Sequence, residues 1–283
     1  MTQPQTPEDI KREATEYWNN AAAGWRKNDV NLRRSTAPVT RRLLDLAGIG
    51  AGMRVLDIAS GTGLPGLPAA EAVGAGGSVL LTDQSPEMLA VARDNAAERG
   101  LTNVEFRLVD GESLDVPAAS FDAATCRWGI MFMPEPARCL RRVLGALKPG
   151  GRFAVATWGP PEQNPFVTIP MGVLLKYKSD IPRPDPNAPG IFAFSQRNRL
   201  AAVFSEAGFT DVATEDMELY PSDFDSPDDY WEMTLRGGPV SRWLPELPED
   251  VQQKVREEII AIVTGADGRV KLKGYALLAG GRK

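Results

Sequence analysis

The feature that most constrains the fold is a glycine-rich turn between a short apolar run and a helix. Met53–Ile58 is apolar and predicts a buried strand. Gly61-Thr-Gly63-Leu-Pro-Gly66 follows and matches the pattern G-x-G-x-x-G, and Leu67–Val73 looks helical. Asp83 stands 20 residues after Gly63, at the end of the next predicted strand. This layout is typical of a site that holds an adenosine ribose through its hydroxyl groups.

The alternation of strands and helices continues through the first half of the chain. We predict strands at Ser78–Thr82, Val104–Val109, Phe121–Cys126 and Phe153–Thr157, and helices at Pro86–Arg99 and Pro136–Leu147. Strands and helices alternating at short spacing predict a parallel sheet covered on both faces. With right-handed crossovers this becomes a doubly wound α/β fold.

The flanking regions are less regular. A helix is expected from Thr6, its N-cap, to about Lys27, and a second over Val39–Leu46. Part of Pro160–Gly190 is proline-rich and is expected to be an irregular loop. The remaining predictions are a helix at Ser195–Ala207, strands at Val212–Tyr220 and Val270–Ala279, and two or three helices over Pro227–Thr264, broken at Gly237-Gly-Pro239 and Pro245–Pro248.

Composition excludes several kinds of chemistry. The chain has no histidine, which excludes Ser-His-Asp and Cys-His triads, histidine metal sites and histidine acid–base catalysis. Its formal charge of -5 predicts no net attraction to nucleic acid or anionic membranes. Cys126 and Cys139 are expected to be reduced thiols of a cytoplasmic protein. The start of the chain is polar, unlike a signal peptide, and no apolar run approaches the roughly 18 residues of a membrane span.

Two details near the glycine turn bear on which cofactor it would hold. Asp57 lies inside the strand end, where its carboxylate would repel a pyrophosphate but suit the ammonium and sulfonium of S-adenosylmethionine (SAM). Pro65, expected in the first turn of the next helix, removes an N–H group that a diphosphate would use. Two alternatives stay open: an NAD(P) site, and a purely structural turn capped by Asp57.

An ordered set of segments then resembles one family. Val55-Leu-Asp-Ile-Ala-Ser-Gly-Thr-Gly63 looks like motif I of the class I SAM-dependent methyltransferases, especially the ubiquinone/menaquinone C-methyltransferases, although Ala59-Ser60 departs from the usual glycine at the first motif position. The resemblance extends over Met53–Trp158. Its other segments are Leu81–Leu89, Phe106–Glu112, Ser120–Cys126 and Leu144–Phe153.

The resemblance implies a fold, a cofactor and its contacts. The sheet would be a seven-stranded, doubly wound, Rossmann-like methyltransferase sheet with N-terminal helices and late helical insertions. Residues 1–48 would form lid helices, 49–160 the SAM-binding core, and 161–283 the rest of the sheet with substrate-pocket insertions, in a single overall domain. The implied SAM contacts are Asp57 (near the methionine ammonium, directly or through water), Ala59, Ser60, Gly61 and Gly63 (methionine and ribose), Asp83 (ribose hydroxyls), Gln84, Met88, Asp110, Gly111 and Glu112 (adenine), Arg127 (methionine end) and Trp25 (covering the cofactor).

The acceptor is expected to be a small, ring-bearing metabolite, methylated on carbon or oxygen by in-line displacement without a metal. Candidate pocket residues are Trp18, Trp128, Met131, Tyr177 and Trp231, with a core role as the alternative for each. No catalytic residue is assigned. Without histidine, we favour a substrate that ionises by itself; Glu135 lies nearby but is better explained by the start of a helix.

Other functional classes remain as alternatives. Nucleic-acid methyltransferases that act on exocyclic amines carry an Asn/Asp-Pro-Pro-aromatic motif after the fourth strand, where this chain reads Arg127-Trp-Gly-Ile130. No nucleic-acid partner is therefore expected, and a homodimer is left open. An NAD(P)-dependent oxidoreductase and a SAM-fold protein with a non-methylation reaction are the other candidates.

Overall fold

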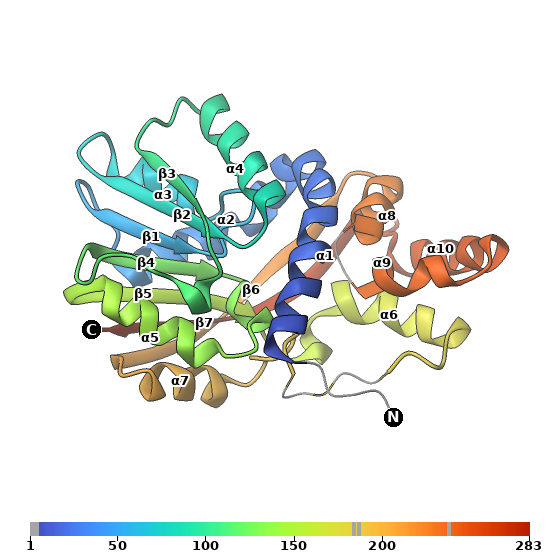
Figure 1. Cartoon of the computed structure of the whole chain (residues 1–283). Coiled ribbons are helices and arrows are strands. Elements are labelled where there is room, and N and C mark those ends of the chain that lie inside the picture. The colour runs from blue at the N-terminus through green and yellow to red at the C-terminus, as the bar shows by residue number, and fades with distance from the viewer. Residues whose placement is uncertain (1–5, 183–184, 186–187, 237–238) are drawn as a thin grey trace.

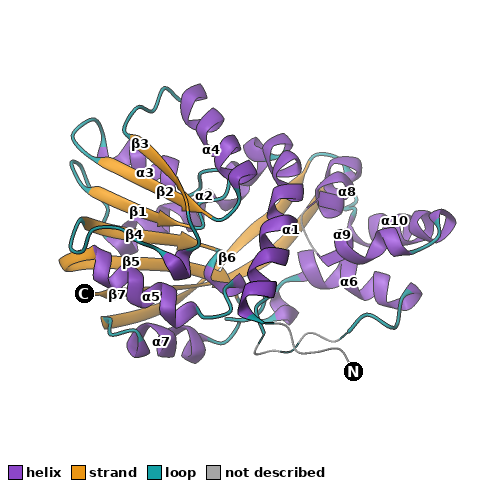
Figure 2. Ribbon diagram, in the orientation of Figure 1, coloured by secondary structure: helices purple, strands orange, loops and turns teal. Residues whose placement is uncertain are grey.

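The computed structural model describes residues 6–182, 185, 188–236 and 239–283, which form one seven-stranded sheet with helices on both faces (Figures 1 and 2). The strand order is β3-β2-β1-β4-β5-β7-β6. The strands are β1 (Arg54–Ile58), β2 (Ser78–Asp83), β3 (Val104–Leu108), β4 (Phe121–Arg127), β5 (Leu147–Trp158), β6 (Thr210–Phe224) and β7 (Val270–Arg282).

The expectation of a doubly wound α/β sheet is confirmed, with one difference in strand direction. β1 to β5 pair in parallel, but β7 runs antiparallel to both β5 and β6. The sheet is therefore mixed rather than wholly parallel. Hydrophobic patterning could not reveal this reversal, because a buried strand has the same composition in either direction.

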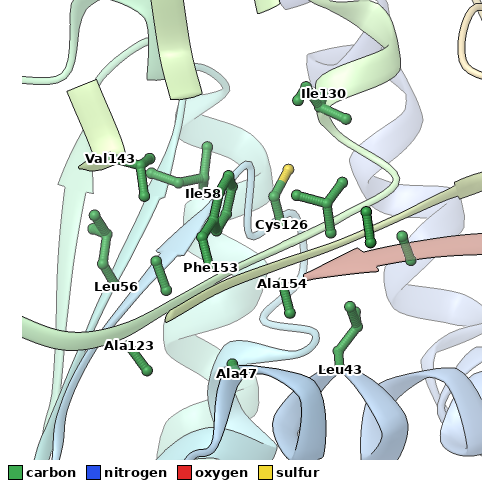
Figure 3. Packing of buried hydrophobic residues seen from close by; sticks show 14 of the residues in the cluster. Leu43, Ala47, Leu56, Ile58, Ala123, Cys126, Ile130, Val143, Phe153 and Ala154 are labelled. Atoms are coloured by element: carbon green, nitrogen blue, oxygen red, sulfur yellow. The ribbon is translucent and has the colours of Figure 1, made fainter. Parts of the chain in front are cut away.

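The helices between the strands lie close to their predicted positions. They are α3 (Gly66–Val73), α4 (Pro86–Glu98), α5 (Pro136–Ala146) and α7 (Arg197–Glu206). Leu56, Ile58 and Phe153 are fully buried between the helical layers (Figure 3). The order of the chain reverses between β1 and its neighbour β4, so their carboxyl ends flank the crevice where open α/β sheets bind ligands.

The first N-terminal helix was predicted well and the second was not. α1 (Pro7–Lys27) has the expected Thr6 N-cap, completed by Asp9 as a capping box. α2 (Asp29–Ala47) begins at Asp29, well before the predicted Val39. Its buried face includes the polar residues Thr36 and Thr40, so the apolar periodicity that marks a helix begins later in the sequence than the helix itself.

The second half adds a helical layer beyond the sheet. α6 (Pro165–Tyr177), α8 (Pro227–Arg236), α9 (Pro239–Trp243) and α10 (Glu249–Val263) surround a second apolar cluster (Figure 1). α6 lies within the stretch where an irregular loop was expected. Of the predicted helix breaks, Pro245–Pro248 separates α9 from α10, while Gly237 and Gly238 lie outside the described residues. In the described part of the chain, no helix is both long and apolar enough to cross a membrane.

Candidate active site

The glycine turn lies at the carboxyl end of β1 and has the backbone that its sequence requires. Gly61 and Gly63 adopt positive φ angles of 53° and 104°. A Cβ atom at Gly63 would come within 2.6 Å of Leu67, whereas one at Gly61 would meet no atom within 4 Å. Gly63 therefore serves close packing, and Gly61 leaves free space above the turn. Pro65 lies just before α3 rather than inside its first turn.

Ser60 and Ala59 were both expected to contact the cofactor through their backbone, and they have different roles in the turn. Ser60 is buried, and its hydroxyl donates to the carbonyl oxygens of Asp57 (3.0 Å) and Thr82 (3.2 Å), which joins the turn to β2. Ala59 occupies the position of the usual family glycine and has a positive φ of 51°. The alanine thus adopts the backbone conformation that glycine accepts at lower cost.

Asp57 lies beneath the turn and is fully buried. Its Oδ2 accepts from the N–H of Gly66 (2.9 Å) and its Oδ1 from the hydroxyl of Thr125 (2.7 Å). Burial raises the pKa of Asp57 to about 7, opposed by these hydrogen bonds and by the charge of Arg127. The carboxylate occupies the amino end of α3, where a dinucleotide site would hold its pyrophosphate. This geometry disfavours the NAD(P) alternative and gives Asp57 a supporting role in the turn.

Asp83 joins the end of β2 to the glycine turn. Its Oδ2 accepts from the N–H of Gly61 (2.8 Å) and its Oδ1 from the N–H of Ser85 (2.9 Å). Burial raises the pKa of Asp83, while backbone N–H groups oppose the rise. Gln84 follows at half-buried depth, and Met88 is buried in the first turn of α4. A carboxylate accepts about four hydrogen bonds, so Asp83 keeps capacity for a ligand.

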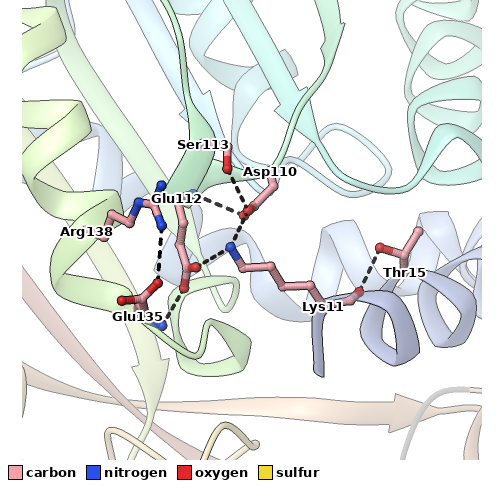
Figure 4. A network of polar contacts seen from close by, with 7 residues as sticks. All are labelled: Lys11, Thr15, Asp110, Glu112, Ser113, Glu135 and Arg138. Carbon is pink, nitrogen blue, oxygen red and sulfur yellow. Dashed lines mark hydrogen bonds and ion pairs between the residues drawn. The ribbon is translucent and has the colours of Figure 1, made fainter. Parts of the chain in front are cut away.

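The loop after β3 carries a carboxylate pair that the sequence resemblance located but whose partner it missed (Figure 4). Asp110 Oδ1 accepts from the N–H of Glu112 (3.0 Å), and Gly111 is buried between them. The ammonium of Lys11, on α1, lies 2.7 Å from Asp110 Oδ2 and 2.5 Å from Glu112 Oε2. Glu112 is fully buried and also accepts from the N–H of Glu135 (2.5 Å).

Glu135 itself stands at the N-cap position of α5, as its helix-start role predicts. Its side chain makes no cap bond and pairs with the exposed Arg138 instead. Its backbone N–H is fixed by Glu112.

Arg127 is a buried cation at the carboxyl end of β4. Its Nη1 donates to the hydroxyls of Thr36 (2.5 Å) and Thr40 (3.1 Å) on α2. Its Nε is buried and has no hydrogen-bond partner among the described residues. Burial lowers the pKa of Arg127 to about 10, and the nearby carboxylate of Asp57 opposes this. An unsatisfied charged donor in the crevice is complementary to an anionic oxygen.

The next residue, Trp128, belongs to an aromatic stack beside Arg127. The guanidinium of Arg127 lies 4.7 Å from the ring centroid of Trp128, and the Trp128 ring stacks on Trp158 at 4.4 Å and 8°. Phe166 of α6 packs on Trp158 at 4.6 Å. Trp128 has a φ of 57°, rare for a bulky residue, and its indole N–H is buried without a partner among the described residues. Trp158 was not predicted, yet its place at the end of β5, the strand next to β4, is a signal that could have found it.

The tryptophans of α1 dock this helix on the same edge of the sheet. Trp18 packs edge-on against Phe132, after β4, at 5.3 Å, and against Trp25 at 5.9 Å. Both tryptophans contact the small cluster that contains Met88. The Trp25 indole N–H is buried without a partner among the described residues.

Of the remaining candidates, Met131 lies in the short helix after β4 (Ile130–Phe132), while Tyr177 and Trp231 lie away from this edge. Met131 is buried in the main core. Trp231 belongs to the second apolar cluster, and Tyr177, at the end of α6, donates to Glu258 of α10 (3.1 Å). The structure therefore brings Trp18 and Trp128 close to the carboxyl edge of the sheet but leaves Tyr177 and Trp231 in the outer helical layer.

The hydrogen-bond donors and acceptors at the carboxyl ends of β1, β2 and β4 and in the loop after β3 fit SAM. The carboxylate oxygens of Asp83 and Asp110 can accept hydrogen bonds, Gly61 leaves room above the turn, and the buried Nε of Arg127 is a cationic donor. With a carboxylate already at the amino end of α3, the same crevice suits a diphosphate poorly.

Comparisons with known proteins agree with this geometry. Residues 49–169 match a family described as a methyltransferase domain. The chain is 33% identical to the aklanonic acid methyltransferase DauC of Streptomyces sp. (strain C5) over 166 residues, which cover 56% of this chain and 74% of that protein. It is 34% identical to the ubiquinone/menaquinone biosynthesis C-methyltransferase UbiE of Pseudomonas putida over 188 residues, which cover 62% and 73%.

Solved structures share the fold at lower identity. The [4+2]-cyclase SpnF superposes with a TM-score of 0.55 at 24% identity, covering 87% of this chain and 80% of that one. Haemonchus contortus phosphoethanolamine N-methyltransferase 2, in complex with S-adenosylhomocysteine, superposes with a TM-score of 0.57 at 16% identity, covering 100% and 61%. The sequence relatives and the shared fold together show that this chain belongs to the class I SAM-dependent methyltransferases, with SAM as its methyl donor.

Proposed function

We propose that SAM lies across the carboxyl ends of β1, β2 and β4, with its ribose on Asp83 and the glycine turn. The observation that carries this proposal is the hydrogen bond from the N–H of Gly61 to Asp83. It fixes a carboxylate beside the open space above Gly61. Asp57 has no exposed surface, so we assign it the support of the turn instead of direct contact with the methionine ammonium.

The two ends of the cofactor have separate partners in this proposal. Asp110 accepts from the adenine amino group, with Gly111 and Glu112 beside it and Gln84 and Met88 flanking the ring. Arg127 holds the methionine carboxylate through its unpaired Nε. Ala59, Ser60 and Gly63 complete the turn, and Trp25 covers the cofactor from α1.

The acceptor that suits this site is a small ring-bearing metabolite methylated on carbon or oxygen. The stacked indoles of Trp128 and Trp158 offer an apolar wall for a flat ring, and the unpaired Trp128 N–H can donate to a ring oxygen. Trp18 and Met131 lie on neighbouring segments. The names of the relatives, an aklanonic acid methyltransferase and a quinone-pathway C-methyltransferase, support this class of acceptor.

The chemistry demands little of the side chains. SAM, when bound, would supply an activated methyl group, carried on a positively charged sulfur, for transfer to an ionised acceptor. The chain positions the acceptor and excludes water. Donation from Trp128 would favour the oxyanion form of an enol, phenol or quinol, so the acceptor can lose its proton to bulk water before the site closes, without a protein base.

The division of labour along the chain follows. The lid is α1 alone, because α2, which also lies within residues 1–48, packs on the sheet with Leu43 and Ala47 in the main core. Residues 49–160 bind SAM, and 161–283 complete the sheet and the substrate side, within one domain. Two buried free thiols, Cys126 and Cys139, suit a reducing cytoplasm.

The test has two stages. Calorimetric titration should show binding of SAM and S-adenosylhomocysteine and none of NADH. The purified enzyme is then incubated with methyl-labelled SAM and a panel of hydroxyaromatic, quinol and β-dicarbonyl compounds, with Trp128→Phe as the matched variant. Label should enter a ring-bearing compound, and Trp128→Phe, which keeps the ring and loses the N–H, should raise the KM for that compound. Binding of NADH instead of SAM would refute the cofactor site, and a panel in which no compound takes up label would refute the proposed class of acceptor.

A further inference from the structure

Lys11 connects the N-terminal helix α1 to the loop after β3 through ion pairs (Figure 4). Its ammonium lies within 2.7 Å of Asp110 and 2.5 Å of Glu112, and its side chain is only 19% exposed. Burial alone would lower the pKa of Lys11, but its hydrogen bonds to both carboxylates outweigh this and the pKa is raised. The ammonium is therefore firmly charged at neutral pH.

This contact connects three segments that are distant in the sequence. Glu112 has no exposed surface and also holds the backbone N–H of Glu135, at the start of α5. Lys11 thus joins α1 to the loop after β3 and, through Glu112, to the loop after β4. Removing the ammonium would leave a buried carboxylate without its cation, which is costly in a low-dielectric environment.

The rest of α1 lies over the neighbouring loops. Asn19 accepts from the hydroxyl of Ser85 at 2.6 Å, next to Asp83, and Trp18 packs on Phe132. Further along, Arg26 pairs with Asp94 of α4 at 2.7 Å. The helix therefore touches the segments after β2 and β3, which are proposed above to hold the ribose and adenine. It also touches the loop after β4, beside the proposed acceptor side.

We propose that Lys11 is a positioning residue that clasps α1 over the bound cofactor and sets the rate at which SAM and its product leave. The inference rests on the proposed SAM site. Asp110 is shared: Oδ1 accepts from the N–H of Glu112, and Oδ2 accepts from Lys11 and from the hydroxyl of Ser113 (3.4 Å). One lone pair of Oδ1 is left for the adenine amino group. Breaking the ion pair loosens α1 without removing a cofactor acceptor.

The experiment measures release directly. Wild type, Lys11→Met and Lys11→Arg are loaded with radiolabelled SAM and chased with excess unlabelled S-adenosylhomocysteine, and the retained label is followed on filters. Arg12→Met is the matched control, because Arg12 is the adjacent cation of α1 and pairs with Asp9 of its own helix. Thermal unfolding of each protein without cofactor establishes that it is folded, and Lys11→Gln replaces Lys11→Met if the latter does not fold.

Lys11→Met should release SAM about tenfold faster than wild type, which corresponds to about 1.4 kcal/mol. Lys11→Arg and Arg12→Met should stay near wild type. Amide hydrogen exchange in the first turns of α1 should rise in Lys11→Met alone.

Equal release from wild type and Lys11→Met would overturn the proposal. Slower release from Lys11→Met would also overturn it, because it would mean that the ammonium competes with adenine. Failure of wild type to bind SAM at all would instead contradict the proposed cofactor site, so the two failures can be told apart.

Discussion

The methyl group of Ala59 occupies the space that the missing side chain of Gly129 leaves open. A Cβ atom built on Gly129 would stand 2.4 Å from the Cβ of Ala59, closer than two carbon atoms can approach. Ala59 opens the glycine turn with a φ of 51°, and Gly129 follows β4 with a φ of -96°. The turn after β1 and the loop after β4 therefore depend on each other at this one contact.

We predict that Gly129→Ala destabilises the protein by about 1–3 kcal/mol, the usual cost of overpacking. The backbone of Gly129 suits alanine, so the cost comes from the collision with Ala59. Ala59→Gly removes both the methyl group and the left-handed strain, and the double variant Ala59→Gly/Gly129→Ala should recover most of the loss. Urea unfolding of the three variants measures the coupling.

Gly145→Ala serves as the control for this series. Gly145 lies in α5, and an added Cβ would meet no atom within 4 Å, so alanine there should leave stability unchanged or raise it. The coupling is refuted if Gly129→Ala costs the same with Ala59 and with glycine at position 59.

The strands β1, β2 and β4 were predictable because each one is a short, largely apolar run bounded by turn residues. The prediction of β1 at Met53–Ile58 differs from the observed strand by one residue at its start. The beginning of α2 was not predictable in this way. There the helix buries threonines that bind Arg127, and the reason for that burial lies on a strand far along the chain.

The residues of the proposed cofactor site also divide into those that the sequence predicted and those that it did not. Asp83 was placed by its distance from the glycine turn, since adjacent parallel strands bring their carboxyl ends together. Lys11 and Trp158 were missed, because neither belongs to a motif with fixed spacing. Asp57 was expected inside the end of β1 and lies there, but its full burial was not foreseen. Its hydrogen-bond donors are Gly66 and Thr125, and only the folded chain brings the latter alongside.

Asp83→Asn should weaken binding of S-adenosylhomocysteine by at least about tenfold. The amide oxygen can still accept from one backbone N–H. The amide NH₂ group, however, cannot accept from the other N–H or from a ribose hydroxyl, as the second carboxylate oxygen can. Glu87→Gln is the matched change on the exposed side of α4 and should bind as wild type does. Isothermal calorimetry at constant pH compares the two, and equal affinities would remove Asp83 from the proposed ribose site.

Asp57 should make the stability of the protein fall as pH rises. Its pKa is about 7 in the folded chain against an ordinary value of 3.8, with burial as the main cause. The folded protein therefore takes up a proton that the unfolded chain does not hold between about pH 4 and 7. The stabilisation is complete below this window and is lost through it, because each pKa unit corresponds to about 1.4 kcal/mol.

Asp57→Asn tests this dependence. The amide can accept from the Gly66 N–H and donate to the Thr125 hydroxyl, yet it cannot titrate. Urea unfolding from pH 4.5 to pH 8 should show a steeper decline in the unfolding free energy for wild type than for the variant. Parallel curves would mean that Asp57 keeps the same pKa in the folded and unfolded chains.

Arg127→Met should separate stability from cofactor binding. Arg127 is buried, and an apolar side chain of similar volume often replaces a buried charge without loss of stability. The free energy of unfolding should therefore be unchanged or higher at pH 6, where Asp57, with its pKa of about 7, is mostly protonated. Affinity for SAM should fall by about tenfold or more if the unpaired Nε receives the methionine carboxylate.

A truncated ligand locates that loss. 5′-Methylthioadenosine lacks the amino-acid part of SAM, so wild type and Arg127→Met should bind it equally, whereas SAM and S-adenosylhomocysteine should discriminate between them. Competition against labelled SAM gives all three affinities for each protein. If Arg127→Met lowered the affinity for the truncated ligand by the same factor, Arg127 would be shaping the whole crevice through Thr36 and Thr40. An unfolding free energy that dropped together with the SAM affinity would point to that same structural role.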